Sequence, residues 1–229
     1  LQVEQSATLN VSLVDVDGEA LDRQTIALPA AGGVVRRQVA FPVTPYTPGG
    51  WYHFVVAGTQ QAAVSQVQVT HTFAPPDVAR IDHPMTATVG EITFLGYDLA
   101  GAGREPFTAQ PGDTLTLDLY WQTDREIEER YTVFTHLVGE AFNPATNGPL
   151  WAQQDQEPVG GTYPTTQWLV GRPLRDRYVL AIPDDAPAGE YVIEVGMYLT
   201  AAGERLSVSG QGADVENQRL LLTTVQVVP

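Results

Sequence analysis

The phrase P-x-G-x-Y-x-x-x-V occurs twice in the chain, as Pro48-Gly49-Gly50-Trp51-Tyr52-His53-Phe54-Val55-Val56 and as Pro187-Ala188-Gly189-Glu190-Tyr191-Val192-Ile193-Glu194-Val195. Each copy follows a run of alternating apolar residues, at 39–43 and at 178–182. Proline and glycine favour a turn, and apolar residues at every second position favour a strand. The phrase therefore predicts two strands joined across one end of a β-sandwich. Its tyrosine hydroxyl should stay near the turn while the ring enters the core, as in the tyrosine corner of immunoglobulin-like folds.

Two copies of the phrase in 229 residues predict an all-β chain of two tandem β-sandwich domains. The first, residues 1–75, is expected to be a small immunoglobulin-like sandwich. The second, residues 85–229, is expected to be a larger acidic sandwich of the jelly-roll or immunoglobulin-like kind. The sequence Phe-Ala-Pro-Pro-Asp at 73–77 breaks the alternation, and adjacent prolines favour an extended linker. We expect that linker at residues 76–84.

Alternating runs predict about five strands in the first domain and about eight in the second. The expected strands of the first domain include 7–14, 24–28, 34–43, 50–58 and 62–70. Those of the second lie near 91–99, 114–122, 131–138, 150–155, 175–182, 189–198, 205–208 and 219–227. The acidic stretch 124–130 is expected to form a loop between two of them.

The absence of cysteine and of lysine excludes several kinds of chemistry. The chain has no Cys, and all 12 of its basic residues are Arg. Thiolate nucleophiles, disulfides and cysteine metal sites are therefore absent. A Walker phosphate loop and a Schiff-base lysine both need a Lys, so these are absent too. No G-x-S-x-G elbow is present, and no pair of carboxylates is marked for glycoside hydrolysis. We expect no catalysis by this chain.

The charge of the chain is unevenly distributed. The formal net charge is −15, yet residues 1–75 carry only 5 acidic and 3 basic side chains. An acidic surface repels phosphate backbones and anionic lipids, so neither nucleic acid nor a membrane surface is an expected partner. The charge is compatible with calcium, with neutral sugars or with solubility alone. No apolar run approaches a membrane span, so no direct membrane insertion is expected.

The most distinctive loop is Gly-Gly-Thr-Tyr-Pro-Thr-Thr-Gln-Trp at 160–168. Tyr163 and Trp168 have amphipathic rings that can stack on the apolar face of a sugar. Asp155, Gln167 and Arg172 are the expected polar partners in such a glycan site. In the alternative interpretation, Trp168 closes one end of the sandwich, and the glycines only let the loop fold over it.

Other aromatic and histidine residues favour structural roles. One of Tyr120 and Trp121 must face outward if their strand is regular, so one ring is expected to be half-covered. The four histidines have no metal-binding spacing, and His136 is expected to be buried and hydrogen-bonded. We expect no cofactor.

Two acidic stretches of the sequence are candidate calcium sites. Asp15-Val16-Asp17-Gly18-Glu19 resembles the start of a calcium loop, but its sixth position is Ala20 and its twelfth is Ile26. A hairpin turn fits better, and no metal site is assigned there. Asp184-Asp185 is either an oxygen cluster for a cation or, more commonly, a pair of turn residues.

Residues 91–227 resemble a known family through a series of phrases. These are LGYDL (95–99), QPGDTLTLDLYWQ (110–122), YTVFTHLV (131–138), EPVGGTYPTTQW (157–168), the long run 175–208 and LLLTTVQV (220–227). They are similar to the non-catalytic C-terminal region of membrane-embedded, protein-mannosyltransferase-like glycosyltransferases of filamentous green bacteria. The turn at 143–149 looks longer than in that family, and residues 1–75 resemble only a generic bacterial immunoglobulin-like domain. The resemblance implies a location outside the cytoplasm and supplies no catalytic residue.

Two hypotheses follow for function. In the first, the chain is a non-catalytic extracytoplasmic accessory module, with weak binding of a cell-envelope glycan in the second domain. In the second, it is a structural spacer or a protein-contact domain with no small-molecule ligand. The chain starts with Leu rather than Met, and we expect it to be a piece of a larger membrane or surface protein, whose neighbouring domains are possible partners.

Overall fold

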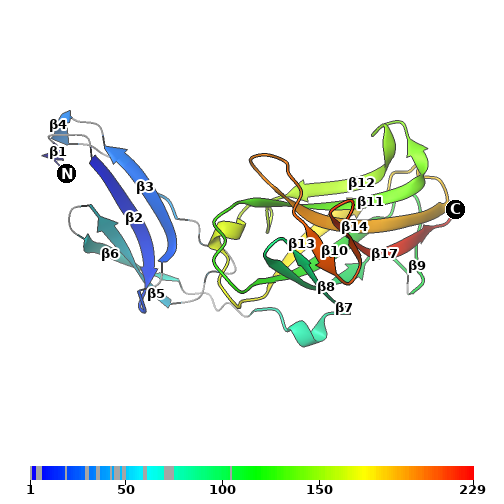
Figure 1. The fold of residues 1–229 in the computed structure, drawn as a ribbon, viewed down its shortest axis with the longest axis horizontal. Helices are drawn as coiled ribbons and strands as arrows, with labels where there is room; N and C mark the ends of the chain where they lie inside the picture. The colour runs from blue at the N-terminus through cyan, green and yellow to red at the C-terminus, as the bar shows by residue number, and fades with distance from the viewer. Residues whose placement is uncertain are drawn as a thin grey trace. The chain divides into compact units, whose positions relative to one another are not determined.

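The computed structural model describes residues 2–3, 7–18, 20–28, 31–34, 37–41, 43, 47, 50–58, 61–69, 75–103 and 105–229. Over these residues the chain is all-β, as the alternating pattern predicted, and contains no α-helix. It divides into two compact units, Leu1–Ala74 and Pro75–Pro229 (Figure 1). In the same described part, no helix is long and apolar enough to cross a membrane.

The first unit is built on a four-stranded antiparallel sheet in the order β3-β2-β5-β6, with β1 and β4 paired separately. Their bounds are β1 Gln2–Val3, β2 Ala7–Asp15, β3 Ala20–Leu28, β4 Ala31–Val34, β5 Gly50–Ala57 and β6 Gln61–Val69. β2 and β3 are joined through the Asp-Gly turn that the sequence indicated, where Gly18 has a φ of 90°. Glycine reaches this left-handed region without the steric cost of a Cβ.

One face of this sheet carries the core of the first unit. Leu13, Tyr52 and Val69 are buried there. Tyr52 belongs to the first copy of the P-x-G-x-Y phrase, and its ring enters the core as predicted; Pro48 and Gly49 lie outside the described residues. The strand expected at 34–43 is wrong, because β4 ends at Val34 and residues 37–41 are not in a strand. Phe41 instead packs on the core, with its ring centroid 5.7 Å from that of Phe54.

The second unit contains two facing sheets. The five-stranded sheet has the order β13-β10-β8-β7-β15, and the six-stranded sheet has the order β12-β11-β14-β17-β16 with β9 parallel to β17. The bounds are β7 His83–Val89, β8 Ile92–Ala100, β9 Phe107–Ala109, β10 Thr114–Thr123, β11 Tyr131–Asn143, β12 Gly148–Gln156, β13 Leu174–Ala181, β14 Gly189–Leu199, β15 Val208–Gly210, β16 Ala213–Asp214 and β17 Arg219–Val227. Two short 3-10 turns, η1 Val78–Arg80 and η2 Thr165–Gln167, complete the unit.

The order of the strands is that of an immunoglobulin-like sandwich rather than a jelly roll. β8, β10 and β13 lie side by side as the A, B and E strands of that fold do. β11, β14 and β17 occupy the places of strands C, F and G, and β12 lies beside β11 in the place of C′. Between the sheets, large side chains are fully buried, among them Trp121, Tyr178, Tyr191 and Phe94.

The second copy of the phrase forms the predicted tyrosine corner. Tyr191 lies near the start of β14 and is only 1% exposed. Its hydroxyl donates a hydrogen bond of 2.8 Å to the carbonyl of Pro187. The ring packs edge-on against Trp151, with 6.2 Å between centroids. The phrase thus ties the turn before β14 to the core of the sandwich.

Residues 76–84, expected to be a linker, are part of the second unit. Asp77 accepts a hydrogen bond from the backbone N–H of Ala79 and begins the turn η1. Ile81 is buried, and His83 opens β7. The first unit ends at Ala74, one residue before the predicted end of the first domain. Residues 76–84 belong to the second unit because Ile81 is buried and β7 pairs with β8, which the alternation in the sequence did not indicate.

Candidate functional site

The loop at 157–172 folds over the end of the second sandwich. Tyr163 is only 3% exposed and Trp168 only 5%. The indole Nε1 of Trp168 donates a hydrogen bond of 3.1 Å to the carbonyl of Tyr163. Gly160 and Gly161 have φ values of 63° and 78°, which let the backbone double back. The loop therefore closes on itself with both rings inside.

The polar atoms of this loop are used to fix it to the sandwich. The hydroxyl of Thr165 donates to the carbonyl of Glu129 at 2.6 Å and accepts from the N–H of Tyr131 at 3.1 Å. At the other end, the N–H of Val159 donates to a carboxylate oxygen of Asp176 at 2.9 Å. Buried polar groups need such partners, since an unpaired one costs free energy. These hydrogen bonds explain why the loop is polar, because Thr165 and the backbone of Val159 attach it to the sandwich.

The glycan site expected from the sequence is not assembled. A ring that stacks on a sugar must offer one face to solvent, and neither Tyr163 nor Trp168 does so. Of the expected polar partners, Asp155 pairs with His136, Gln167 lies in the turn η2, and Arg172 is exposed. The prediction of sugar stacking on these rings is therefore corrected: both rings pack into the end of the sandwich.

Asp176 holds the underside of this loop and is fully buried. Its second carboxylate oxygen accepts a hydrogen bond of 2.6 Å from the hydroxyl of Tyr178. Burial raises the pKa of Asp176 to about 6, although the hydrogen bonds from Tyr178 and Val159 act in the opposite direction. The carboxyl group is thus a structural acid whose ionisation falls near neutral pH.

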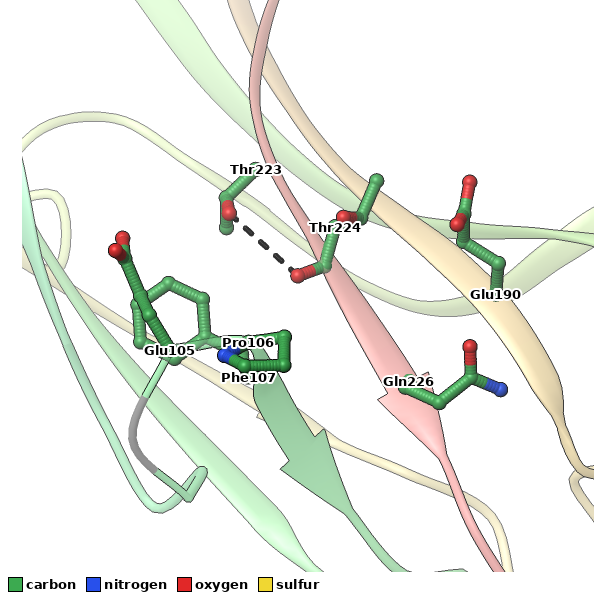
Figure 2. Close-up of a pocket in the computed structure, with 7 residues that line it drawn as sticks. All are labelled: Glu105, Pro106, Phe107, Glu190, Thr223, Thr224 and Gln226. Carbon is green, nitrogen blue, oxygen red and sulfur yellow. Dashed lines mark hydrogen bonds between the residues drawn. The ribbon is translucent and has the colours of Figure 1, made fainter.

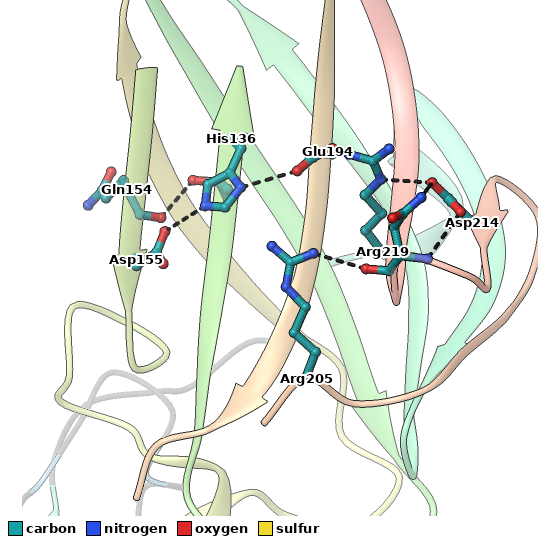
Figure 3. A network of polar contacts seen from close by, with 9 residues as sticks. His136, Gln154, Asp155, Glu194, Arg205, Asp214 and Arg219 are labelled. Carbon is teal, nitrogen blue, oxygen red and sulfur yellow. Dashed lines mark hydrogen bonds and ion pairs between the residues drawn. The ribbon is translucent and has the colours of Figure 1, made fainter. Parts of the chain in front are cut away.

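A row of charges crosses the outer face of the six-stranded sheet (Figure 3). We call it the charge ladder: Asp155, His136, Glu194, Arg219 and Asp214, one residue from each of β12, β11, β14, β17 and β16. His136 Nδ1 lies 3.2 Å from Glu194, and its Nε2 lies 3.3 Å from Asp155. Arg219 contacts both Glu194 and Asp214, the latter at 2.8 Å. Opposite charges therefore alternate along the ladder if His136 is protonated.

The ladder favours a protonated histidine. The His136 side chain is 12% exposed and that of Glu194 5%. Burial alone disfavours the imidazolium, but the two flanking carboxylates outweigh it, and the pKa of His136 is raised above its ordinary value of 6.5. The expectation of a hydrogen-bonded His136 is confirmed, and its side chain is mostly rather than fully buried. Nε2 has no hydrogen bond of good geometry, so its contact with Asp155 is electrostatic.

The ladder is not arranged as a metal site. Asp155 and Glu194 face different nitrogens of the imidazole ring (Figure 3), so His136 separates the two carboxylates. An ion needs several ligands converging on one point. Within the described ranges, no group of three or more His, Asp or Glu residues could hold a metal ion.

Phe134 covers the end of the ladder nearest the loop after β14. Phe134 is only 1% exposed although it lies on the outer face of the sheet. The guanidinium of Arg205 covers its ring, with 4.3 Å between the guanidinium carbon and the ring centroid. Arg205 also donates to the carbonyl of Asn217 at 2.9 Å. A Cβ at Gly196 would collide with the Phe134 ring, so glycine allows this close approach. The outer face is sealed at this point by a cation over an aromatic ring.

A pocket of about 450 Å³ lies where β9 runs beside β17 (Figure 2). Its volume is within the usual range for small-molecule sites. Two carboxylates, two hydroxyls and one amide line it together with Pro106 and Phe107; the polar residues are Glu105, Glu190, Thr223, Thr224 and Gln226. Phe107 is buried, and Glu105 pairs with His83 at 3.5 Å. The seven lining residues include no imidazole or hydroxyl–base pair, so they offer polar contacts and no evident nucleophile.

The adjacent aromatic residues of β10 are both buried, against the expectation that one is half-covered. Trp121 is fully buried, and Tyr120 is 6% exposed with its hydroxyl donating to Asp98 at 2.6 Å. The register of β10 against β8 shifts between these two residues. A β-bulge changes the local twist and re-aims side chains, which no single-strand pattern reveals.

No family model and no curated protein matches the chain. Among solved structures, the chain is similar to a DUF3823 family protein from Bacteroides ovatus, with 10% sequence identity and a TM-score of 0.33, over 99% of this chain and 92% of that one.

Proposed function

We propose that this chain is a non-catalytic accessory module that acts through its fold, as a spacer or a protein-contact domain, and not through sugar stacking on the loop at 157–172. The observation that carries the proposal is the burial of Tyr163 and Trp168. Those rings belong to the loop that was the strongest binding candidate in the sequence. In the structure the loop is held closed by its own hydrogen bonds and is anchored to the sandwich. A closed end of this kind suits a rigid structural unit.

The location and the wider context are part of the same proposal. The resemblance of residues 91–227 to the C-terminal region of protein-mannosyltransferase-like enzymes supports a place outside the cytoplasm, within a larger membrane or surface protein. The excess of acidic side chains also fits an exposed, soluble surface. Neighbouring domains of that larger protein are then the nearest partners.

Tryptophan indole resonances provide the test, because the chain has only four Trp residues. The full-length chain would be titrated with neutral cell-envelope oligosaccharides to millimolar concentration, with each indole N–H assigned through a Trp→Phe variant. The Trp168 resonance should not move, because its N–H is held by Tyr163 inside the loop. A saturable shift of Trp168, lost in Asp155→Asn, would restore the glycan site and overturn the proposal.

The hairpin between β11 and β12 favours the contact-domain form of the proposal. Phe142 is 62% exposed near its tip. The tip is braced from within: Asn143 donates to the carbonyl of Leu150 at 2.8 Å, and Trp151 donates to that of Ala141 at 3.0 Å. A rigid exposed aromatic is a common anchor of protein interfaces because little conformational entropy is lost on binding.

Site-specific photo-crosslinking separates this contact from incidental collisions. A photoreactive phenylalanine would replace Phe142 or, as a matched control, Val215, which is 65% exposed in another loop. In cells producing the protein at its native length, we expect cross-links to one defined neighbour from position 142 only. Equal yields from both positions would remove the hairpin from the proposal.

A further inference from the structure

In the first unit, the sheet face opposite to Leu13 and Tyr52 carries an exposed tryptophan, Trp51. The register places Trp51 opposite Gln68 and His53 opposite Gln66 on β5 and β6. Residues directly opposite in an antiparallel pair point to the same face, as do alternate residues along a strand. Trp51, His53, Gln66 and Gln68 therefore share a face, which we call the Trp51 face. Tyr52, which lies between the first two, points to the buried side.

Trp51 differs from every other tryptophan in its exposure. It is 45% exposed, whereas Trp121, Trp151 and Trp168 are all below 8%. Gln66 and Gln68 are exposed beside it, and His53 is half-buried. Indole has a large apolar face, and leaving it in water forgoes a free-energy gain that packing would provide. A ring in this position is available to a ligand without any rearrangement of the core.

The surroundings of Trp51 are nearly uncharged and mix polar with apolar side chains. On β2 and β3 the same face continues with Ser12 opposite Arg23 and Asn10 opposite Thr25. Val14 lies opposite His53, and Val55 lies opposite Ser12. Among the described residues that the register places here, Arg23 is the one charged side chain, and no carboxylate occurs. This contrasts with the acidic remainder of the chain, where residues 76–229 carry 22 acidic and 9 basic residues.

We propose that the Trp51 face binds a neutral saccharide. The apolar face of a sugar ring would lie on the indole of Trp51, and its hydroxyls would bond to the amides of Gln66 and Gln68 and to the ring of His53. Gln68 lies directly across from Trp51, and Gln66 lies on the adjacent diagonal, within the reach of such side chains. The site is in the first unit, whereas the loop at 157–172, whose burial supports the proposed function, belongs to the second unit.

The chemistry of the face favours a saccharide over other ligands. A nucleic acid would require a basic surface, and this face has one Arg. A site with one stacking ring binds weakly, so dissociation constants in the millimolar range are expected for short oligosaccharides.

Acrylamide quenching of tryptophan fluorescence tests the site directly, because Trp51 supplies the accessible emission. The full chain would be quenched with and without 10 mM hexasaccharides of β-1,4-glucose, β-1,4-N-acetylglucosamine and α-mannose. We expect at least one to reduce the quenching constant of the accessible component by twofold or more. The Trp51→Ala variant should lose binding of that sugar at least tenfold by saturation-transfer NMR, and Gln68→Ala should lose it several-fold.

A matched control and two contrary outcomes complete the test. Val215→Ala removes an exposed apolar side chain from the second unit and should leave sugar binding unchanged. Binding that survives Trp51→Ala, or the absence of protection by all three hexasaccharides, overturns the proposal. Protection of Trp51 by a proline-rich peptide and by no sugar would also overturn it and assign the face to a protein ligand.

Discussion

Trp168 and Trp51 lie in unlike sequence contexts and differ in exposure. Trp168 ends a loop of glycine, threonine and glutamine, and it is buried. Trp51 is followed by Tyr52, at the start of an apolar strand, and it is nearly half exposed. The difference shows that exposure depends on what lies above a residue in the fold. The polar loop finds backbone partners and closes, while the strand presents alternate residues to opposite sides.

Truncating the two rings should give the largest contrast in stability. Trp168→Ala removes a buried ring from the end of the second sandwich, and losses of about 3–5 kcal/mol are typical for such cavities. The change in unfolding free energy is measured by urea denaturation of the full chain, monitored by near-ultraviolet circular dichroism. Three of the four Trp residues lie in the second unit. A cost below about 1 kcal/mol would mean that the loop does not depend on Trp168 and that its burial is incidental.

The sequence predicts the strands more reliably than it predicts the site. Period-two alternation and the P-x-G-x-Y phrase were sufficient for the all-β class and for the tyrosine corner of Tyr191, because both depend on local geometry. The burial of Trp168 depends on Thr165 reaching Glu129 and Val159 reaching Asp176, which are distant in the sequence. The bulge beside Trp121 likewise arises from the register of two strands. Such pairings are invisible in a single strand's pattern.

Asp176 offers a second way to test the anchoring of the loop, through pH. Its folded pKa, raised to about 6 by burial, lies above the ordinary value of 3.8. The folded state therefore holds this proton more tightly than the unfolded state. Its contribution to stability is fully present below the unfolded pKa and is lost as the pH rises to about 6. The loss amounts to about 3 kcal/mol for a shift of this size.

Asp176→Asn should remove this pH dependence. The difference in unfolding free energy between the wild type and the variant should fall by about 2 kcal/mol from pH 4 to pH 6.5 and change little above that. Denaturation at five pH values measures it, and Asp184→Asn, in an exposed turn, is the matched control. A difference that does not vary with pH would show that Asp176 stays ionised when buried.

The charge ladder should respond more modestly, and at a different part of the second unit. Asp155→Asn removes one of the two carboxylates that raise the pKa of His136, so the NMR titration midpoint of His136 should fall. In the wild type, the stability from this raised pKa is present below pH 6.5 and lost as the pH rises through the folded value. We expect a cost of about 1 kcal/mol at pH 6 and less at pH 8.

Asp185→Asn, which changes an exposed turn of the same unit, is the matched control for this experiment. The titration midpoint of His136 should be the same in this variant as in the wild type. An unchanged His136 midpoint in Asp155→Asn would mean that the contact at Nε2 contributes nothing. From the sequence, Asp155 was expected as a polar partner of Tyr163 and Trp168, and only the pairing of β11 with β12 brings it beside His136.

Trp51→Ala should have the smallest effect on stability and so completes the comparison with Trp168. A side chain that is 45% exposed and lies opposite the core loses little packing on truncation, so the unfolding free energy of the first unit should change by less than about 1 kcal/mol. The same variant should abolish most acrylamide-accessible fluorescence, whereas Trp168→Phe should leave it intact. A large loss of stability in Trp51→Ala would mean that the ring is a structural element, and the Trp51 face would then have no surplus aromatic surface to offer a ligand.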